Sequence, residues 1–309
     1  MGVPSPSCGR FFCYASRGCG ARVAGAVRVR ESASPGDGHA LAFAAMGDAT
    51  EEITDALDPA RAAALHAALG RSGPPPGLGD PLPPYWHQIY FWRALPSTAL
   101  GDDGHPMRGA GLIPDFGLPR RMWAGGRLTF HTPLRAGIRA TRVSRCIRAE
   151  EKTGRTGPLA IVTLRHEIRQ RGALTVSEEQ DLVYRAADAP PGRPPDRPAA
   201  ADHREVRTFD STLLFRYSAL TFNGHRIHYD ADYSRGVEGY SGLVVHGPLL
   251  ATLMMDLAVR QGGALTGFSF RATAPLSLPG LARFAIRGAD LWAEDDTGRV
   301  LMVGQAAWG

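Results

Sequence analysis

The segment from Pro248 to Gln261 constrains the fold of this chain most, because it is apolar on almost every side. Its spacing predicts a helix, since proline suits the first helical turn, where its missing N–H costs nothing, and the following Gly262-Gly263 suits the end. Its polar side chains form one narrow stripe, made by Thr252, Asp256 and Arg260. A helix of this kind must be enclosed by other elements, so we expect it inside a core.

Segments typical of half-buried antiparallel strands lie before and after this helix. They alternate apolar and polar residues, as strands do when one face packs on a core and the other meets water. They cover residues 127–132, 138–148, 159–170, 174–184, 265–272, 281–292 and 300–307, and residues 212–217 also have strand character. One buried helix wrapped by an antiparallel sheet is the hotdog arrangement, and the chain has strands for two such units.

The proline-rich residues 186–202 are typical of a linker and divide the body of the chain into two units of similar size. We predict an α+β double hotdog, with an N-terminal unit at residues 46–185 and a C-terminal unit at residues 203–309. The first unit opens with an amphipathic helix up to about Leu69 but lacks a long apolar run, so we expect its central helix to be eroded. Residues 1–45 lack a helical period, and we expect a disordered extension before a true start at Met46.

Charge and cysteine content exclude several classes of protein. The formal net charge is +5, but residues 1–45 hold five arginines against two acids, so the other residues carry only +2. Acidic and basic residues alternate there without a basic stripe, which argues against nucleic-acid binding. No run reaches the ~18 apolar residues of a membrane-spanning helix. Only Cys146 lies outside residues 1–45, which suits a reducing compartment. We expect the bacterial cytoplasm, or the mitochondrial matrix if residues 1–45 are a transit peptide.

Two polar segments of the second unit carry the candidate chemistry. Residues 218–230 form a loop that contains Asn223, His225 and His228, and residues 239–248 lead through His246 and Gly247 into the apolar helix. An imidazole with a pKa near ~6.5 can take a proton and return it. An amide cannot take a proton, so Asn223 can only orient a reacting group. The exposed N–H of Gly247, at the positive end of the helix dipole, can polarise a carbonyl.

Two other interpretations of these segments stay open at the level of sequence. His225, His228 and Asp230 have the side chains of a metal site, since histidine and carboxylate are normal zinc ligands. The Gly247-Pro248 pair is also common at the start of a helix that has no catalytic role. We expect no metal, because nothing else in the chain points to one.

The loop and the helix start resemble the MaoC-like hydratase/dehydratase family, hotdog enzymes that act on acyl thioesters. The family signature is Asp-x-Asn-Pro-x-His, followed by a hydrophobic strand and His-Gly at a helix start. Alignment on the last histidine places His228 at the catalytic position, Asn223 at the aspartate position and His225 at the asparagine position. The sequence of residues 223–229, Asn-Gly-His-Arg-Ile-His-Tyr, is similar to the motif of the hydroxyacyl-thioester dehydratase type 2 branch. The amide of Asn223 is therefore interpreted as a feature of that branch.

The first unit carries a matching resemblance. Residues 84–87, 101–106, 120–126 and 152–157 resemble the N-terminal half of the bacterial mesaconyl-C4-CoA (3-methylfumaryl-CoA) hydratases. The resemblance covers about residues 50–309. It implies a hydro-lyase that adds water to the C=C bond of a short branched enoyl-CoA, with mesaconyl-C4-CoA giving citramalyl-CoA. Alternatives are a (3R)-3-hydroxyacyl-thioester dehydratase of fatty-acid synthesis, and a non-catalytic hotdog that binds CoA.

The resemblance also implies roles for further residues and partners. Catalysis is assigned to His228, Asn223 and Gly247, and His225 is a neighbour on the substrate side. Arginine binds carboxylates in a bidentate manner, so Arg120 and Arg121 are candidates for a free carboxylate of the substrate. Arg271 is a candidate for the phosphates of CoA. No cofactor is expected beyond the CoA of the substrate. Acyl carrier protein and a second copy of the chain are further candidate partners.

Overall fold

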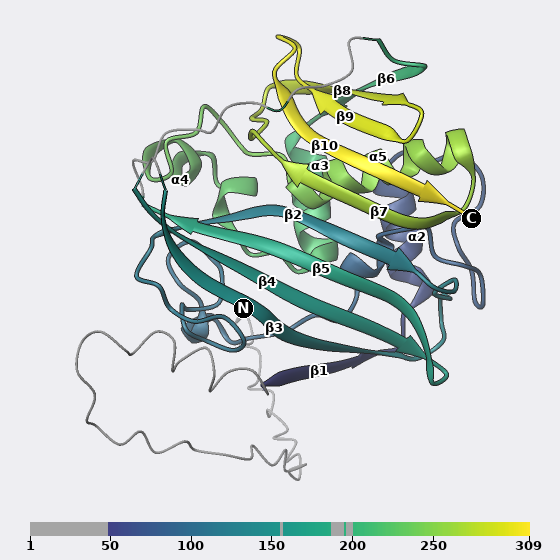
Figure 1. The fold of residues 1–309 in the computed structure, drawn as a ribbon, viewed down its shortest axis with the longest axis horizontal. Coiled ribbons are helices and arrows are strands. Elements are labelled where there is room, and N and C mark those ends of the chain that lie inside the picture. The colour runs from purple at the N-terminus through teal and green to yellow at the C-terminus, as the bar shows by residue number, and fades with distance from the viewer. Residues whose placement is uncertain (1–48, 155–156, 187–194, 196–199) are drawn as a thin grey trace, which may run out of the picture. The chain divides into compact units, whose positions relative to one another are not determined.

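The computed structural model describes residues 49–154, 157–186, 195 and 200–309. The predicted extension and most of the predicted linker lie outside these residues. Ten strands form one sheet in the order β1-β3-β4-β5-β2-β7-β10-β9-β8-β6 (Figure 1). The strands are β1 (Thr50–Asp55), β2 (Arg120–Phe130), β3 (Ala140–Gly154), β4 (Gly157–Gln170), β5 (Ala173–Arg185), β6 (His203–Phe209), β7 (Leu265–Ala272), β8 (Gly280–Arg287), β9 (Asp290–Glu294) and β10 (Val300–Trp308).

The sheet joins the two predicted units edge to edge. Strands β1 to β5 come from the first unit and β6 to β10 from the second, and every pair of neighbours is antiparallel. The junction is the pairing of β2 with β7, which runs from Gly125 opposite Arg271 to Thr129 opposite Gly267. Strand β2 is therefore a central strand of the sheet, with β5 of its own unit on one side and β7 of the second unit on the other.

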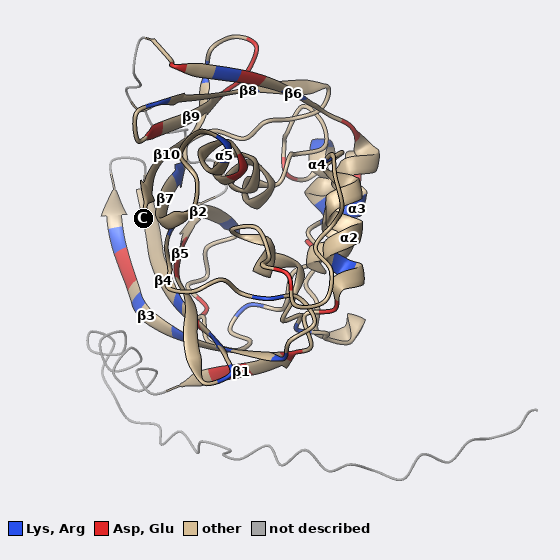
Figure 2. Ribbon diagram, turned by 90° about the vertical axis from the view of Figure 1, so that its right-hand side faces the viewer, with Lys and Arg blue, Asp and Glu red and all other residues tan. Residues whose placement is uncertain are grey.

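Helix α5 (Gly247–Gly262) confirms the prediction of an enclosed apolar helix. The sheet curves around it, and helices α2 (Pro59–Ala68) and α3 (Ser211–Thr221) close the open side (Figure 2). All ten residues from Leu249 to Ala258 are buried, including the polar Thr252 and Asp256. The Asp256 carboxylate forms an ion pair with Arg71 Nη2 at 2.8 Å. Burial nevertheless raises the pKa of Asp256 to about 6.

The predicted opening helix of the first unit is in fact a strand followed by a shorter helix. Residues 50–55 alternate between exposed and half-buried and pair with β3. The helix starts only at Pro59, where the Asp58 side chain caps it by accepting from the N–H of Ala60. A 3₁₀ turn, η1 (Trp86–Ile89), supplies further buried apolar side chains. The long central helix of a hotdog unit is thus replaced by two short elements, as the eroded-helix prediction requires.

The prediction of a strand at residues 212–217 is wrong, because these residues lie in α3. The Asp210 side chain accepts a hydrogen bond from the N–H of Leu213 at 2.7 Å and so caps the helix. The buried positions are Leu214, Tyr217 and Ser218, at helical rather than strand spacing. The strand of this region is β6, just before the helix, which the sequence analysis missed.

The other predicted strands of both units are confirmed, except that residues 281–292 form the β8–β9 hairpin. Strand β2 begins seven residues before the predicted start, and β3 ends six residues after the predicted end. Shorter helices complete the described fold: η2 (Ser97–Ala99), η3 (Arg226–His228) and α4 (Ala231–Gly236). In the described part of the chain, no helix has the length and apolar character needed to cross a membrane.

Candidate active site

His228 lies at the end of η3, in the loop that connects α3 to α4, and its side chain is 7% exposed. Its Nδ1 lies 2.7 Å from the carbonyl oxygen of Val244. Because a carbonyl can only accept, Nδ1 carries the hydrogen and Nε2 keeps its lone pair. Burial lowers the pKa of His228 to about 4. The ring is therefore neutral at neutral pH, with Nε2 in the form that accepts a proton.

His246 fixes the plane of the His228 ring. The two imidazoles stack with their centroids 3.7 Å apart and an angle of 18° between their planes. His246 is fully buried, its Nε2 is 2.8 Å from Ser218 Oγ on α3, and burial lowers its pKa well below the usual range. A neutral ring that is itself held in place supports His228 without competing for protons.

Asn223 shapes the loop before His228. Its Oδ1 accepts a hydrogen bond from the backbone N–H of His225 at 2.9 Å, which closes a tight turn. The His225 ring then stands at 88° to the His228 ring, with centroids 5.5 Å apart, and burial lowers the pKa of His225 to about 3. Since the amide oxygen is committed to the turn, the NH₂ group of Asn223 is the part left for a ligand.

Gly247 opens α5, and the structure gives a specific reason for glycine there. A Cβ at this position would lie 2.5 Å from Cε3 of Trp123, which reaches over from β2. The space beside the Cα is filled by the indole. The Gly247 N–H is in the first turn, where helical N–H groups have no partner within the helix. The oxyanion role of Gly247 therefore stays a prediction.

A loop of the first unit docks onto the histidine loop, which the sequence analysis did not foresee. Gly104, with φ of 84°, touches Gly224 so closely that a Cβ on Gly104 would overlap the Gly224 carbonyl oxygen. The N–H of Arg226 donates to the Asp103 carbonyl at 2.9 Å. This contact places the His105 ring 4.2 Å from the His225 ring, measured between centroids.

Asp103 and His105 form a hydrogen-bonded pair within that loop. Oδ2 of Asp103 is 3.1 Å from Nδ1 of His105, and Oδ1 accepts from the His105 backbone N–H at 2.9 Å. Burial works against the charged carboxylate, but the hydrogen bonds and charge of His105 hold the pKa of Asp103 well below its usual range. The sequence feature that could have indicated this pair is Asp103-Gly-His-Pro106, two titratable residues next to turn-forming ones. The sequence analysis interpreted it only as part of the family resemblance.

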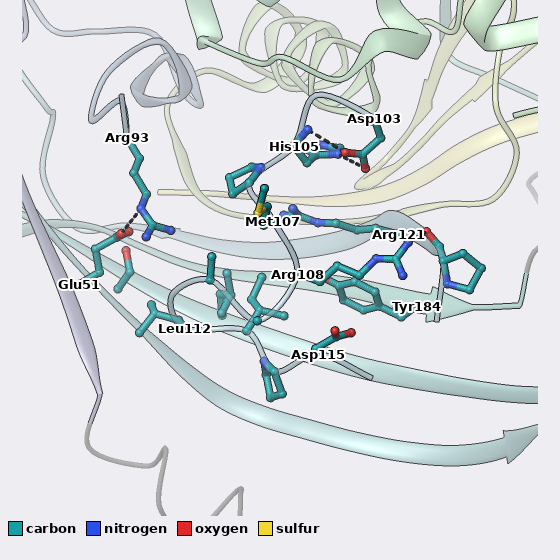
Figure 3. Close-up of a pocket in the computed structure, with 18 of the residues that line it drawn as sticks. Glu51, Arg93, Asp103, His105, Met107, Arg108, Leu112, Asp115, Arg121 and Tyr184 are labelled. Atoms are coloured by element: carbon teal, nitrogen blue, oxygen red, sulfur yellow. Dashed lines mark hydrogen bonds and ion pairs between the residues drawn. The ribbon is translucent and has the colours of Figure 1, made fainter. Parts of the chain in front are cut away.

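A cavity of about 140 Å³ opens beside this pair (Figure 3). It lies between the loop of residues 103–119 and strands β2 to β5, and Asp103, His105 and Arg121 line it. Arg121 lies below the Asp103–His105 pair in the view of Figure 3. Among the described residues, no carboxylate forms an ion pair with Arg121. His228 and Asn223 do not line the cavity.

The other predicted substrate residues are placed differently. Arg120, the neighbour of Arg121 on β2, donates from Nη2 to the Glu238 carbonyl at 3.2 Å and does not line the cavity. Adjacent residues of a strand point to opposite faces, which explains the difference. Arg271 is exposed on β7, opposite Gly125. Its predicted contact with CoA phosphates stays a prediction.

The alternative metal set is not assembled. Asp230 accepts from Arg226 at 2.7 Å and caps α4 through the N–H of Tyr233, and Nδ1 of His228 faces a carbonyl. Asp103, His105 and His225 do bring three potential ligand atoms within 4.8 Å of one another. Two hydrogen bonds join His105 to Asp103, and the hydrogen bond from the Arg226 N–H to the Asp103 carbonyl brings the loop of His225 beside them. We interpret it as a hydrogen-bonded acid–base pair.

Comparisons with known proteins match this arrangement. The family model for hydroxyacyl-thioester dehydratase type 2 matches residues 85–278. The chain belongs to the hydroxyacyl-thioester dehydratase type 2 family. It is 48% identical over 231 residues to a mesaconyl-C4-CoA hydratase of Chloroflexus aurantiacus, covering 74% of this chain and 82% of that protein. It is 27% identical to the mitochondrial hydroxyacyl-thioester dehydratase type 2 of Schizosaccharomyces pombe, covering 69% and 80%.

Solved structures confirm the fold. The crystal structure of HtdX of Mycobacterium tuberculosis matches with a TM-score of 0.61 and 18% identity, covering 83% of this chain and 98% of that one. A second Mycobacterium tuberculosis protein, described as having a double hotdog fold, matches with a TM-score of 0.51 and 15% identity, covering 85% and 96%. The predicted α+β double hotdog and the resemblance to MaoC-like proteins are both confirmed.

Proposed function

We propose that this chain is a hydro-lyase that adds water to mesaconyl-C4-CoA and forms citramalyl-CoA. The observation that carries the proposal is the 48% identity, over most of both chains, to a mesaconyl-C4-CoA hydratase. The substrate is an acyl-CoA, and the reaction needs no cofactor besides the CoA that the substrate carries.

The free carboxylate of this substrate requires a positively charged group in the site. In mesaconyl-C4-CoA the carbon that receives the hydroxyl group carries both the methyl branch and the free carboxylate. A cation for that carboxylate must therefore lie a few ångströms from the reacting carbon. Arg121 is our candidate for this cation, because it lines the same cavity as His105. The His105 ring contacts the ring of His225, which lies beside His228.

The size of the cavity favours a short acyl group. At about 140 Å³ it is well below the ~300–1,000 Å³ of pockets for drug-sized ligands. A long fatty acyl chain needs a longer apolar tunnel. The lining of this cavity mixes apolar side chains, such as Leu112 and Ile113, with charged ones, among them Arg108 and Arg121.

In the proposed reaction, Nε2 of His228 takes a proton from water while the water oxygen bonds to the substituted carbon. The electron pair of the C=C bond moves towards the thioester, and the N–H of Gly247 stabilises the charge on the thioester oxygen. The NH₂ group of Asn223 holds the water oxygen. The α-carbon then receives a proton, which completes the addition of water.

A second candidate function is the reverse reaction on a (3R)-3-hydroxyacyl thioester of fatty-acid synthesis, carried by CoA or acyl carrier protein. The observation in its favour is the similarity to the fission yeast hydroxyacyl-thioester dehydratase. It uses the same base and the same oxyanion donor, so only the acyl pocket separates the two functions.

The two functions are tested with matched thioesters whose enoyl absorbance falls on hydration. Crotonyl-CoA keeps the short acyl chain but has no carboxylate, because a methyl group stands where mesaconyl-C4-CoA has the carboxylate and a hydrogen stands where it has the methyl branch. We expect the highest kcat/KM with mesaconyl-C4-CoA, and a lower value with crotonyl-CoA and with a ten-carbon enoyl-CoA. Preference for the ten-carbon substrate would support the dehydratase function, and no turnover of any of them would refute both.

A further inference from the structure

The proposed reaction has two proton transfers but, in the histidine loop, one residue to perform them. One proton leaves water and another reaches the α-carbon. In the family signature an aspartate stands beside the histidine, and here Asn223, which cannot exchange a proton, takes that place. His225 lies close, but burial lowers its pKa to about 3, so at neutral pH it carries no extra proton to give. A single imidazole can take a proton and return it, but a second titratable group from elsewhere in the fold would divide the two transfers between two residues.

The first unit brings such a group to the loop. His105 faces the cavity and lies 4.2 Å from the His225 ring, and its side chain keeps 21% exposure. Its Nδ1 points at the Asp103 carboxylate, which leaves Nε2 for a substrate. A histidine oriented by a carboxylate, with the second nitrogen open, has the arrangement of an acid–base catalyst.

The docking of the two loops holds the pair in place. Gly104, between Asp103 and His105, packs against Gly224 backbone to backbone, and Arg226 donates to the Asp103 carbonyl. Neither glycine can accept a Cβ without movement of the other loop. The position of His105 relative to the histidine loop is therefore set by the backbone of both units, not by flexible side chains.

Charged and neutral groups of both units surround His105. Asp103 contacts its ring from the same loop, and Arg108 of that loop and Arg121 of β2 line the same cavity. His225 and His228 are neutral at neutral pH, because burial lowers the pKa of each. The Asp103 carboxylate is the charged group hydrogen-bonded to the His105 ring, and it orients that ring.

We propose that His105, oriented by Asp103, is the second acid–base residue of the site, and that it supplies the proton to the α-carbon. This inference rests on the proposed function. During hydration, His228 takes one proton of water, the C–O bond forms, and the former π electron pair bonds the proton released from Nε2 of His105. His228 then carries an extra proton and His105 lacks one, and proton exchange with water restores both. In dehydration the same transfers run backwards.

The test is the pH profile of kcat with mesaconyl-C4-CoA. We expect a bell-shaped profile, because His228 must be unprotonated and His105 must be protonated. Activity falls at low pH as His228 gains a proton, and at high pH as His105 loses its proton. We expect His105→Gln to lower kcat by ~10²-fold or more, within the usual range for a general acid or base, and to abolish the alkaline limb. Asp103→Asn removes the partner of the imidazolium, so the alkaline limb should move to lower pH.

Controls separate this inference from the proposed function. His203→Gln, on exposed β6, should leave the profile unchanged. Asp103→Asn preserves shape, so it remains informative if His105→Gln fails to fold, as judged by circular dichroism. If His228→Ala is inactive while both His105→Gln and Asp103→Asn keep the wild-type profile, only the present inference is overturned. If His228→Ala is fully active, the proposed base itself is wrong.

Discussion

Arg121 offers the sharpest test of the substrate. It lines the cavity beside the Asp103–His105 pair, and no carboxylate of the described residues pairs with it, so the arginine is available for a substrate anion. In Arg121→Met the side chain keeps much of its volume but loses both the charge and the hydrogen bonds. We expect a selective loss of activity with the substrate that carries a carboxylate.

The size of the loss follows from the interaction removed. A hydrogen bond to a charged group contributes about 1.5–3 kcal/mol, and each ~1.4 kcal/mol changes a rate constant tenfold. The value of kcat/KM for mesaconyl-C4-CoA should therefore fall about 10- to 150-fold. For crotonyl-CoA, which has no carboxylate, it should change by less than about threefold.

The neighbouring Arg120 provides a comparison of the same residue type on the same strand. It donates to the carbonyl of Glu238, outside the cavity lining, so Arg120→Met loses one hydrogen bond to a neutral acceptor. We expect a smaller loss, of similar size for the two substrates. Equal losses for mesaconyl-C4-CoA and crotonyl-CoA in Arg121→Met, measured at the enoyl absorbance, would refute the assignment of the carboxylate to Arg121.

Five further substitutions test other parts of the structure. His228→Ala should lower kcat by ~10²–10⁴-fold, Asn223→Ala by less, and Asn223→Asp should stay active, as steady-state rates will show. Gly247→Ala forces a methyl group against Trp123, and denaturant titration should show a loss of ~1–3 kcal/mol, the usual cost of overpacking. The raised pKa of Asp256 means that folding favours its protonated form, so the free energy of unfolding should fall between pH 4 and 6 as pH rises. Asp256→Asn should lack that part of the dependence.

The sequence predicted the elements whose pattern is local and strong. Helix α5 follows from an apolar run that only a buried helix can satisfy, and the long strands β3 to β5 follow from alternation over more than ten residues. The strand prediction for residues 212–217 was wrong. Thr212, Phe215 and Tyr217 are residue types enriched in strands. The segment nevertheless forms a helix, which the Asp210 side chain caps and which buries Leu214 and Tyr217.

The part of the site that sequence could not supply is the part made by two distant segments. Residues 223–228 form one contiguous motif, so a family signature finds them. His105 lies more than a hundred residues earlier, and no local pattern indicates that its loop meets Gly224. That meeting depends on how the β2–β7 junction aligns the two units, which is a property of the assembled sheet.

The β2–β7 junction also gives the first unit a part in the site. The sequence analysis placed every candidate catalytic residue in the second unit, and the central helix of the first unit is reduced to two short elements, α2 and η1. Yet β2 carries Arg121 to the cavity and Trp123 to the start of α5, and the loop before β2 carries Asp103 and His105. A hotdog unit that has lost its own histidine motif can keep its strands as a scaffold for groups that the partner unit lacks. On this reasoning, selection for a different acyl group would act on the loop of residues 101–119 and on β2, and would leave His228 and α5 unchanged.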